Sequence, residues 1–95
     1  MHTPANIKKT VQLFKIFSDE TRLRIIALLS DNEYCVQSIC EALNMSQSSI
    51  SHQLKLLRDL NVVKGRREGK NMFYSLKDIH IKEIFEIGLN HALEC

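Results

Sequence analysis

The chain has 95 residues, of which 44% are hydrophobic and 25% are charged, so residues 1–95 suffice for one compact domain and are too few for two. No apolar run reaches the roughly 20 residues of a membrane-spanning helix, and the N-terminal residues lack the apolar core of a secretory signal, which predicts a cytoplasmic protein without a membrane partner. The formal net charge of +2 is too small to identify a partner, and an odd number of cysteines, 3, does not suit a disulfide framework, so we expect reduced thiols.

The first part of the chain predicts helices. Residues 4–17 carry apolar side chains at the spacing of one helical face, and residues 21–29 are too apolar for a surface helix. We therefore expect two helices, the second of them central to the core, with Ser18 or Asp19 as its N-cap. After a break, residues 35–43 repeat apolar side chains at helical spacing and predict a third helix.

A short turn leads from the third helix into a fourth, which we expect over residues 47–60. Its apolar side chains form one seam, and the opposite face is small, hydrogen-bonding and basic. Two helices joined by a short turn, with the second polar on its outer face, form the helix-turn-helix arrangement, whose second helix enters the major groove of DNA. The candidate DNA contacts here are the N-cap and outward residues, namely Ser46, Gln47, Ser48, Ser49, Ser51, His52 and Lys55.

Strand-forming residues at 61–64 and 72–76 bracket residues 66–71 and predict a β-hairpin with a basic tip. Beside a recognition helix such a hairpin is a wing, and Arg66, Arg67 and Lys70 are candidates for contacts with phosphates or a minor groove. A basic stretch is more often only a solvated face. The order of turn, polar helix face and basic hairpin nevertheless favours double-stranded DNA as the partner.

The last predicted helix, over residues 78–94, carries four possible metal ligands, Asp78, His80, His91 and Glu94. They lie on one side of the helix, yet eleven residues span about 16 Å while a metal is about 2 Å from its ligands, so one helix cannot close the site. Two copies paired antiparallel about a two-fold axis would form two sites, each from both chains. Two imidazoles and two carboxylates suit Zn(II), with Co(II) as a mimic. The alternatives are ordinary surface histidines and an Asp78 that only caps the helix.

The segment SICEALNMSQSSISHQLKLLRDLNVVKGRREGKNMFYSL resembles the DNA-binding core of the ArsR/SmtB family, most of all the zinc and cobalt efflux repressors. The segment DIHIKEIFEIGLNHALE is similar to that family's C-terminal metal motif, matched at Asp78, His80, His91 and Glu94. The resemblance implies a mainly α fold with a small β-hairpin, a winged helix-turn-helix that forms a homodimer through its terminal helices. It also implies a repressor that binds operator DNA when metal-free and dissociates when Zn(II) or Co(II) binds, which derepresses metal efflux or resistance genes.

Thiol chemistry is the main alternative for the sensor. Members of the family that sense soft metals use closely spaced thiolates in the third helix, whereas here Gln37 replaces the middle one. Cys35 and Cys40 then lie about 140° apart around a helix and do not readily share a metal. A repressor that senses oxidants or soft metals through Cys35, Cys40 or Cys95 stays open, and Cys95 or His2 could add a ligand to the zinc site. A zinc hydrolase is disfavoured because four protein ligands leave no open position, so we expect no catalysis.

Overall fold

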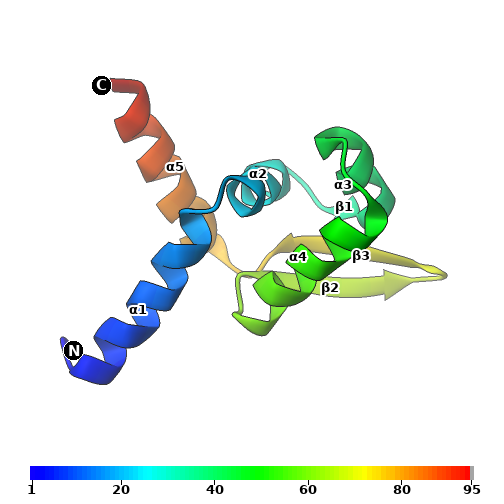
Figure 1. The fold of residues 1–95 in the computed structure, drawn as a ribbon. Coiled ribbons are helices and arrows are strands. Elements are labelled where there is room, and N and C mark those ends of the chain that lie inside the picture. The colour runs from blue at the N-terminus through cyan, green and yellow to red at the C-terminus, as the bar shows by residue number, and fades with distance from the viewer. Residues whose placement is uncertain (95) are drawn as a thin grey trace.

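The computed structural model describes residues 1–94, which form five helices and a three-stranded antiparallel sheet (Figure 1). In chain order the elements are α1 (Pro4–Phe17), α2 (Glu20–Leu29), β1 (Tyr34–Cys35), α3 (Val36–Leu43), α4 (Gln47–Asp59), β2 (Val63–Glu68), β3 (Asn71–Leu76) and α5 (Ile79–Glu94). The strand order is β1-β3-β2. This is the expected winged helix-turn-helix, in which α3 and α4 form the motif and the β2–β3 hairpin is the wing.

Side-chain caps determine where the helices begin. Asp19 accepts a hydrogen bond from the backbone amide of Arg22 at the start of α2, and Ser46 accepts one from the amide of Ser49 at the start of α4. Such acceptors satisfy amides that the first helical turn leaves without a partner. Helix α3 ends at Asn44, whose left-handed backbone (φ 53°) turns the chain into α4. Of the two N-caps predicted for α2, Ser18 or Asp19, the structure has Asp19, and the cap at Ser46 is confirmed.

The core lies between α2, the helix-turn-helix and the base of the wing. The central position expected for α2 is confirmed, because Ile25 and Ile26 are fully buried. The other side chains with less than 2% exposure come from α3, α4 and the start of the wing, and they are Ile39, Ile50, Leu54, Leu57, Val62 and Val63. One apolar cluster therefore fixes the recognition helix and the wing to the same scaffold.

The third helix, expected over about residues 35–43, and the hairpin are both confirmed, but two details of this region were not predicted. Tyr34 and Cys35 form strand β1, which pairs with β3, and Cys35 is then the N-cap of α3. The hairpin was expected to have its strands at 61–64 and 72–76 and a basic tip over 66–71. Instead β2 and β3 pair continuously from Val63–Leu76 to Glu68–Asn71, so only Gly69 and Lys70 form the tip. Pairing with the distant strand β3 produced β1, and continuous pairing across the hairpin lengthened β2 and β3. The spacing of apolar residues along the sequence does not report either kind of pairing.

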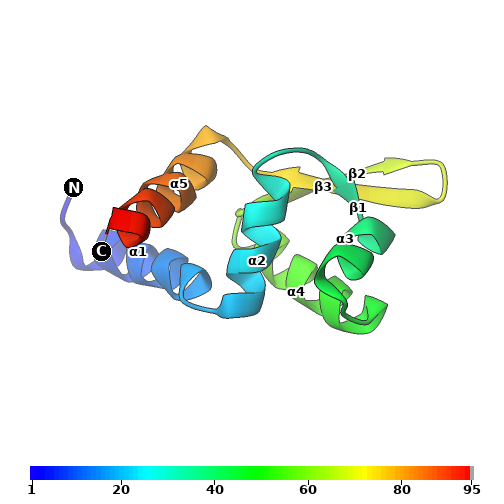
Figure 2. The same cartoon turned by 90° about the horizontal axis from the view of Figure 1, so that it is seen from above.

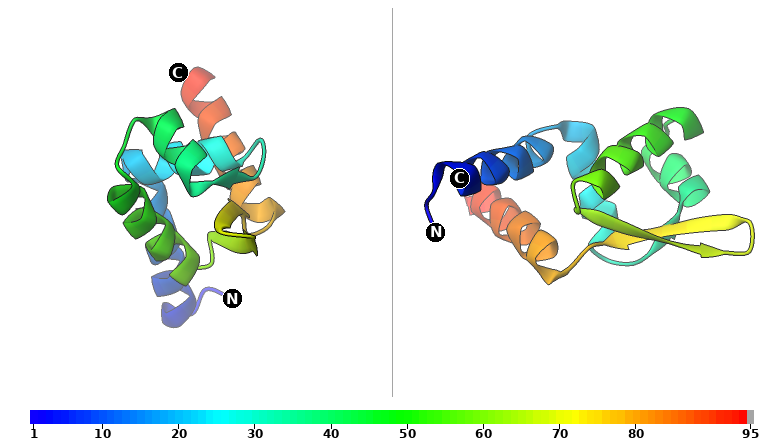
Figure 3. Two further views of the ribbon diagram at one scale, coloured as in Figure 1. Left: turned by 90° about the vertical axis from the view of Figure 1, so that its right-hand side faces the viewer. Right: turned by 90° about the horizontal axis from the view of Figure 1, so that it is seen from below.

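Helices α1 and α5 lie at the end of the molecule opposite the wing (Figures 1 and 2; Figure 3, right). Apolar side chains remain exposed on both helices, namely Ile7, Val11, Phe14, Ile79, Ile87, Leu89 and Leu93. No helix within residues 1–94 is long and apolar enough to cross a bilayer. An exposed apolar patch of this kind is typical of a surface that another protein covers.

Candidate DNA interface and metal ligands

The recognition helix α4 presents two different faces. Ile50, Leu54 and Leu57 are buried against the core, whereas the outward residues are exposed along the whole length of the helix. The exposed group contains every candidate DNA contact proposed for this segment, Ser46, Gln47, Ser48, Ser49, Ser51, His52 and Lys55. The hydroxyl of Ser46 also lies 2.9 Å from the Ser49 hydroxyl, so polar groups cluster at the positive end of the helix dipole. That end is suited to a phosphate group.

One side-chain contact ties α4 to the centre of the molecule. Arg22 Nε on α2 donates a 2.9 Å hydrogen bond to Gln53 Oε1 on α4, and both side chains are partly buried. Helix α2 also packs against α1 and α5. Helix α2 therefore connects the recognition helix with the terminal helices.

The wing carries two unpaired cations at its end. Arg67 lies near the end of β2, and Lys70 lies in the two-residue turn, where Gly69 has a φ of +63°. Glycine at the first position of such a turn gives the type II′ geometry, whose twist matches the flanking strands. Both side chains are exposed, and no ion pair is found for either within residues 1–94.

A cleft of about 630 Å³ separates the recognition helix from the wing. Gln47 and Ser51 of α4 line one side of it, and Lys70 and Met72 of the hairpin line the other. Residues from two separate elements of the chain therefore lie on one continuous polar and basic surface. A groove between a helix and a basic hairpin fits a DNA backbone that passes from one to the other.

Arg66 differs from the other two basic residues of the wing. Its guanidinium binds Glu33 through Nε and Nη2 and binds Glu68 through Nη1, with both Nη contacts at 2.7 Å. The hydrogen bonds from Arg66 lower the pKa of the Glu33 carboxyl, and the two carboxylates raise the pKa of Arg66. The candidate phosphate contact at Arg66 is thus already occupied by carboxylates of its own chain.

The start of α5 holds half of the candidate metal site. Asp78 Oδ1 accepts hydrogen bonds from the backbone amides of His80 (3.0 Å) and Ile81 (3.3 Å), so Asp78 caps the helix. His80 Nδ1 lies 3.6 Å from the same oxygen. Two ligands about 2 Å from one tetrahedral ion are about 3.3 Å apart, so this pair fits a shared cation with a small adjustment. Both side chains face solvent, with 78% of His80 and 48% of Asp78 exposed.

His91 and Glu94 lie at the other end of α5, and both are exposed. Within residues 1–94 of a single chain, no three histidine, cysteine, aspartate or glutamate side chains gather closely enough to hold a metal. A complete set of ligands from these residues would require a second chain.

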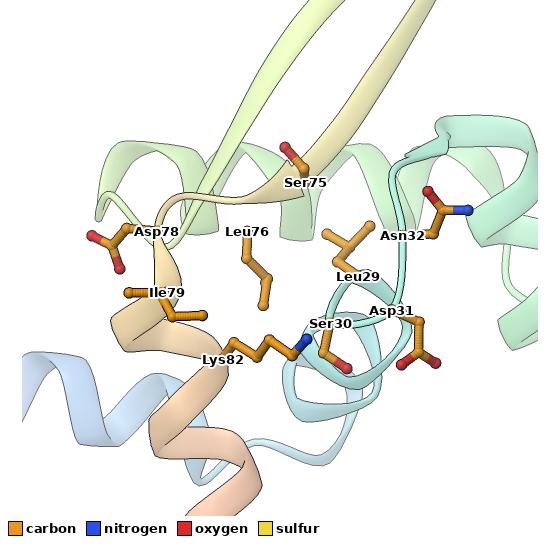
Figure 4. Close-up of a pocket in the computed structure, with 9 residues that line it drawn as sticks. All are labelled: Leu29, Ser30, Asp31, Asn32, Ser75, Leu76, Asp78, Ile79 and Lys82. Carbon is orange, nitrogen blue, oxygen red and sulfur yellow. The ribbon is translucent and has the colours of Figure 1, made fainter.

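The start of α5 packs against the end of α2 and against β3. Figure 4 shows Lys82 extending toward Ser30, while the carboxylate of Asp78 points away from Leu29 and Asp31. A change in the position of α5 would therefore reach α2 and the sheet directly.

Cys35 and Cys40 are free, half-buried thiols. Cys35 Sγ lies 3.2 Å from the hydroxyl of Ser38, and hydrogen bonding from the Ser38 side chain and amide lowers the pKa of the Cys35 thiol. The other candidate residues are less informative, because His2 is an exposed residue at the N-terminus and Cys95 lies outside the described residues.

Glu33, Phe73 and Gln53 were not recognised from the sequence. Glu33 contacts Arg66 across 33 positions and Gln53 contacts Arg22 across 31, so no local pattern links the partners. The only sequence feature near this ion pair was the high density of charged residues over 64–68. It did not identify Glu33, outside the hairpin, as the partner of Arg66.

A family model described as "Bacterial regulatory protein, arsR family" matches residues 19–64. The chain is 36% identical to a transcriptional repressor SmtB homolog from Synechocystis, over 92% of this chain and 66% of the relative, so it spans slightly less than two thirds of that protein. It is 38% identical to a cadmium resistance transcriptional regulatory protein CadC homolog from Staphylococcus aureus, over 94% of this chain and 74% of the relative.

Solved structures agree with these relatives. HlyU from Vibrio cholerae superposes with a TM-score of 0.85 at 36% identity and covers 98% of this chain and 99% of its own. A homodimeric winged helix-turn-helix DNA-binding domain from Mycobacterium bovis, a possible ArsR-family regulator, has a TM-score of 0.89 at 27% identity and covers 95% of this chain and 83% of its own. The M. bovis neighbour is therefore described as a DNA-binding domain of the same fold.

Proposed function

The chain belongs to the ArsR family of bacterial transcriptional regulators, and we propose that it is a homodimeric repressor that binds operator DNA when metal-free and releases it when zinc binds. Like its relatives, it is a transcriptional regulator and not an enzyme. The observation that carries the proposal is the pair of candidate half-sites on α5, Asp78 with His80 at one end and His91 with Glu94 at the other.

A homodimer supplies the second pair of metal ligands that each site lacks in a single chain. The exposed apolar faces of α1 and α5 give each copy a surface to bury, and an apolar groove lined by Phe14, Phe85 and Ile87 runs between these helices. The M. bovis neighbour is described as homodimeric. With α5 helices antiparallel across a two-fold axis, the first half-site of one copy meets the second half-site of the other. This pairing forms two equivalent sites per dimer.

The donor set favours zinc. Each site offers two imidazoles and two carboxylates, which suit a four-coordinate Zn(II) or Co(II) ion, whereas calcium prefers more oxygen ligands and copper(I) prefers sulfur. A bound cation would cross-link the two α5 helices and hold them in one relative position.

Zinc binding at α5 affects DNA binding at α4 because the two helices are connected through α2. Helix α5 packs against α2, and Arg22 of α2 binds Gln53 of the recognition helix. A dimer geometry that zinc favours and that fits two DNA half-sites poorly lowers the affinity for DNA. By thermodynamic reciprocity, DNA must weaken zinc binding by the same factor. Release of the operator then derepresses genes for metal efflux or resistance.

Mixed dimers test whether each site combines ligands from both chains. His80→Ala and Glu94→Gln homodimers should each lose tight zinc binding at both sites, because each removes one ligand from every site. A dimer with one chain of each variant keeps one site with all four ligands, so we expect about one zinc ion per dimer at wild-type affinity. Glu86→Gln removes a carboxylate from the same helix and should bind two ions. A mixed dimer without any tight site would contradict the intersubunit site.

A second candidate function, thiol sensing, is favoured by the lowered pKa of Cys35 at the start of α3. Thiolates react with oxidants and soft metals more readily than thiols do. Replacement of Cys35, Cys40 and Cys95 by serine separates the two functions. Zinc-driven release of DNA by this variant would eliminate thiol sensing as the main switch, and loss of that release would favour it.

A further inference from the structure

Each of the three guanidinium nitrogens of Arg66 donates to a carboxylate of its own chain. Nε donates to both oxygens of Glu33 at 3.0 and 2.9 Å, Nη2 donates to Glu33 Oε1 at 2.7 Å, and Nη1 donates to Glu68 Oε2 at 2.7 Å. Its Cζ atom also lies 5.0 Å from the centroid of the Phe73 ring. A guanidinium held by two carboxylates and stacked on a ring attracts a phosphate weakly, because the group as a whole is negatively charged.

The contacts cross the sheet from one edge to the other. Strand β3 is central, β2 and β1 are the edges, and Phe73 of β3 is paired with Arg66 on one side and with Cys35 on the other. Glu33 immediately precedes β1. Backbone hydrogen bonds join each edge strand to β3, so the Glu33–Arg66 pair adds a side-chain link from β2 to the β1 edge.

Arg66 and Arg67 lie on opposite faces of the wing, because successive side chains of a strand alternate. Arg67 is paired with Met72, which lines the cleft beside the recognition helix. Arg66 is paired with Phe73 and so belongs to the face turned away from that cleft. The face that carries Arg66 is therefore not the one that meets α4.

We propose that Arg66 is a positioning residue, and that the Glu33–Arg66–Glu68 cluster over Phe73 clamps the wing to the β1 edge so that Arg67 and Lys70 reach the DNA backbone. The proposal rests on DNA binding through α4 and the wing, and it is independent of zinc. It replaces the expectation that Arg66 itself contacts DNA. Under this proposal Glu33 supports DNA binding, although its own charge is negative like that of DNA.

The clamp is tested by whether Glu33→Gln raises or lowers the affinity for DNA. Glu33→Gln removes a negative charge, so simple electrostatics would strengthen binding to DNA. The clamp requires the opposite, because the variant frees the wing. We expect Glu33→Gln and Arg66→Gln to lower the affinity of the metal-free protein for its own upstream DNA by a similar factor, about three- to fivefold, as suits an exposed ion pair. The double variant should be no weaker than either single one.

Salt dependence and matched controls complete the experiment. Arg67→Gln should reduce the slope of log affinity against log salt by about 0.9, the loss of one phosphate contact, whereas Arg66→Gln should leave the slope unchanged. Lys64→Gln removes a cation two positions before Arg66 on the same face of β2. Lys64 attracts Glu33 through its charge without a hydrogen bond, so this variant should lower the affinity less than Arg66→Gln. Circular dichroism confirms that each variant is folded, and hydrogen exchange in β1 and β2 should rise in Glu33→Gln and Arg66→Gln alone.

Two results would overturn the clamp. One is an unchanged or higher DNA affinity in Glu33→Gln, and the other is a reduced salt slope in Arg66→Gln, which would make Arg66 a phosphate contact. Because no metal is added, failure of zinc-driven release would count against the proposed function and leave the outcome for the clamp intact.

Discussion

Asp78 caps α5 and is also a candidate metal ligand. Its Oδ1 atom caps α5, and the same group lies beside His80 Nδ1 as a candidate ligand. Asp78→Ser keeps a capping oxygen but removes the charge, whereas Asp78→Ala removes both. We expect Asp78→Ser to bind zinc more than tenfold more weakly, since losing even an outer partner of a ligand costs about ten- to a hundredfold.

The two Asp78 variants differ in stability. Asp78→Ala should lose about 1 kcal/mol of unfolding free energy relative to Asp78→Ser, because an N-cap contributes roughly that amount. Urea denaturation of the metal-free variants measures the difference, and zinc titration measures the ligand role. Wild-type zinc affinity in Asp78→Ser would show that Asp78 is only a cap.

Cys35 is the thiol whose surroundings favour the charged form. The Ser38 hydroxyl and amide lower its pKa, so a larger share of Cys35 is thiolate near neutral pH. We expect Ser38→Ala to raise this pKa and to slow alkylation of Cys35 at pH 7, with little change above its ordinary pKa of 9.0. Mass spectrometry of iodoacetamide-treated protein follows each cysteine separately. An alkylation rate that Ser38→Ala leaves unchanged at pH 7 would contradict the assignment.

At the scale of elements, the sequence predicts the helices better than the wing. Ile50, Leu54 and Leu57 of α4 repeat at the spacing of one helical face, and that local pattern is enough to orient its polar face. Strand β1 has two residues and depends on pairing with β3, and Arg66 depends on a partner 33 positions away. Local sequence patterns do not report contacts between distant residues, so strand β1 and the Glu33 partner of Arg66 were not predicted. The division of the metal ligands between two ends of α5 followed from helix geometry alone.

The proposed Glu33–Arg66–Glu68 clamp along the wing should depend on pH. Arg66 holds the pKa of Glu33 below its ordinary value of 4.5, so the pair stabilises the fold fully above about pH 4.5 and loses this effect as the pH falls through the lowered pKa. Glu33→Gln lacks the titrating group. We therefore expect wild type to have the higher Tm at pH 7 and the difference to vanish in more acidic solution. A constant difference from pH 7 to pH 3 would show that the ion pair is not its source.

At the scale of the whole molecule, the proposed dimer forms through the terminal helices α1 and α5. Ile87 is 69% exposed and Leu93 is 75% exposed on α5, at the end of the molecule away from the DNA-binding surface. We expect Ile87→Glu to weaken dimerisation more than tenfold, because a charge would be buried in an apolar interface. Analytical ultracentrifugation measures the change. Glu86→Gln, the adjacent exposed position, is the control, and an unaltered dimer in Ile87→Glu would place the interface elsewhere.

DNA binding and zinc binding both depend on the proposed dimer. A single winged helix-turn-helix contacts one half-site, and a dimer gains affinity by engaging two half-sites at a fixed separation. The Ile87→Glu variant should therefore lose operator affinity and zinc affinity together, although none of the candidate ligands or DNA contacts is altered. Coupling free energies between two sites of an allosteric protein are typically 1 to 3 kcal/mol, roughly a 5- to 150-fold change in affinity.

The central claim is that zinc bound through α5 releases DNA. The direct measurement is the affinity of the purified protein for its own upstream DNA at fixed salt, titrated with zinc, cobalt, nickel and cadmium, for wild type and His91→Ala. We expect zinc or cobalt to lower the affinity of wild type at least about fivefold, within the usual range of allosteric coupling. His91→Ala should bind metal-free DNA normally and show no such release. Affinity that these metals leave unchanged in wild type, or release that persists in His91→Ala, would contradict the claim.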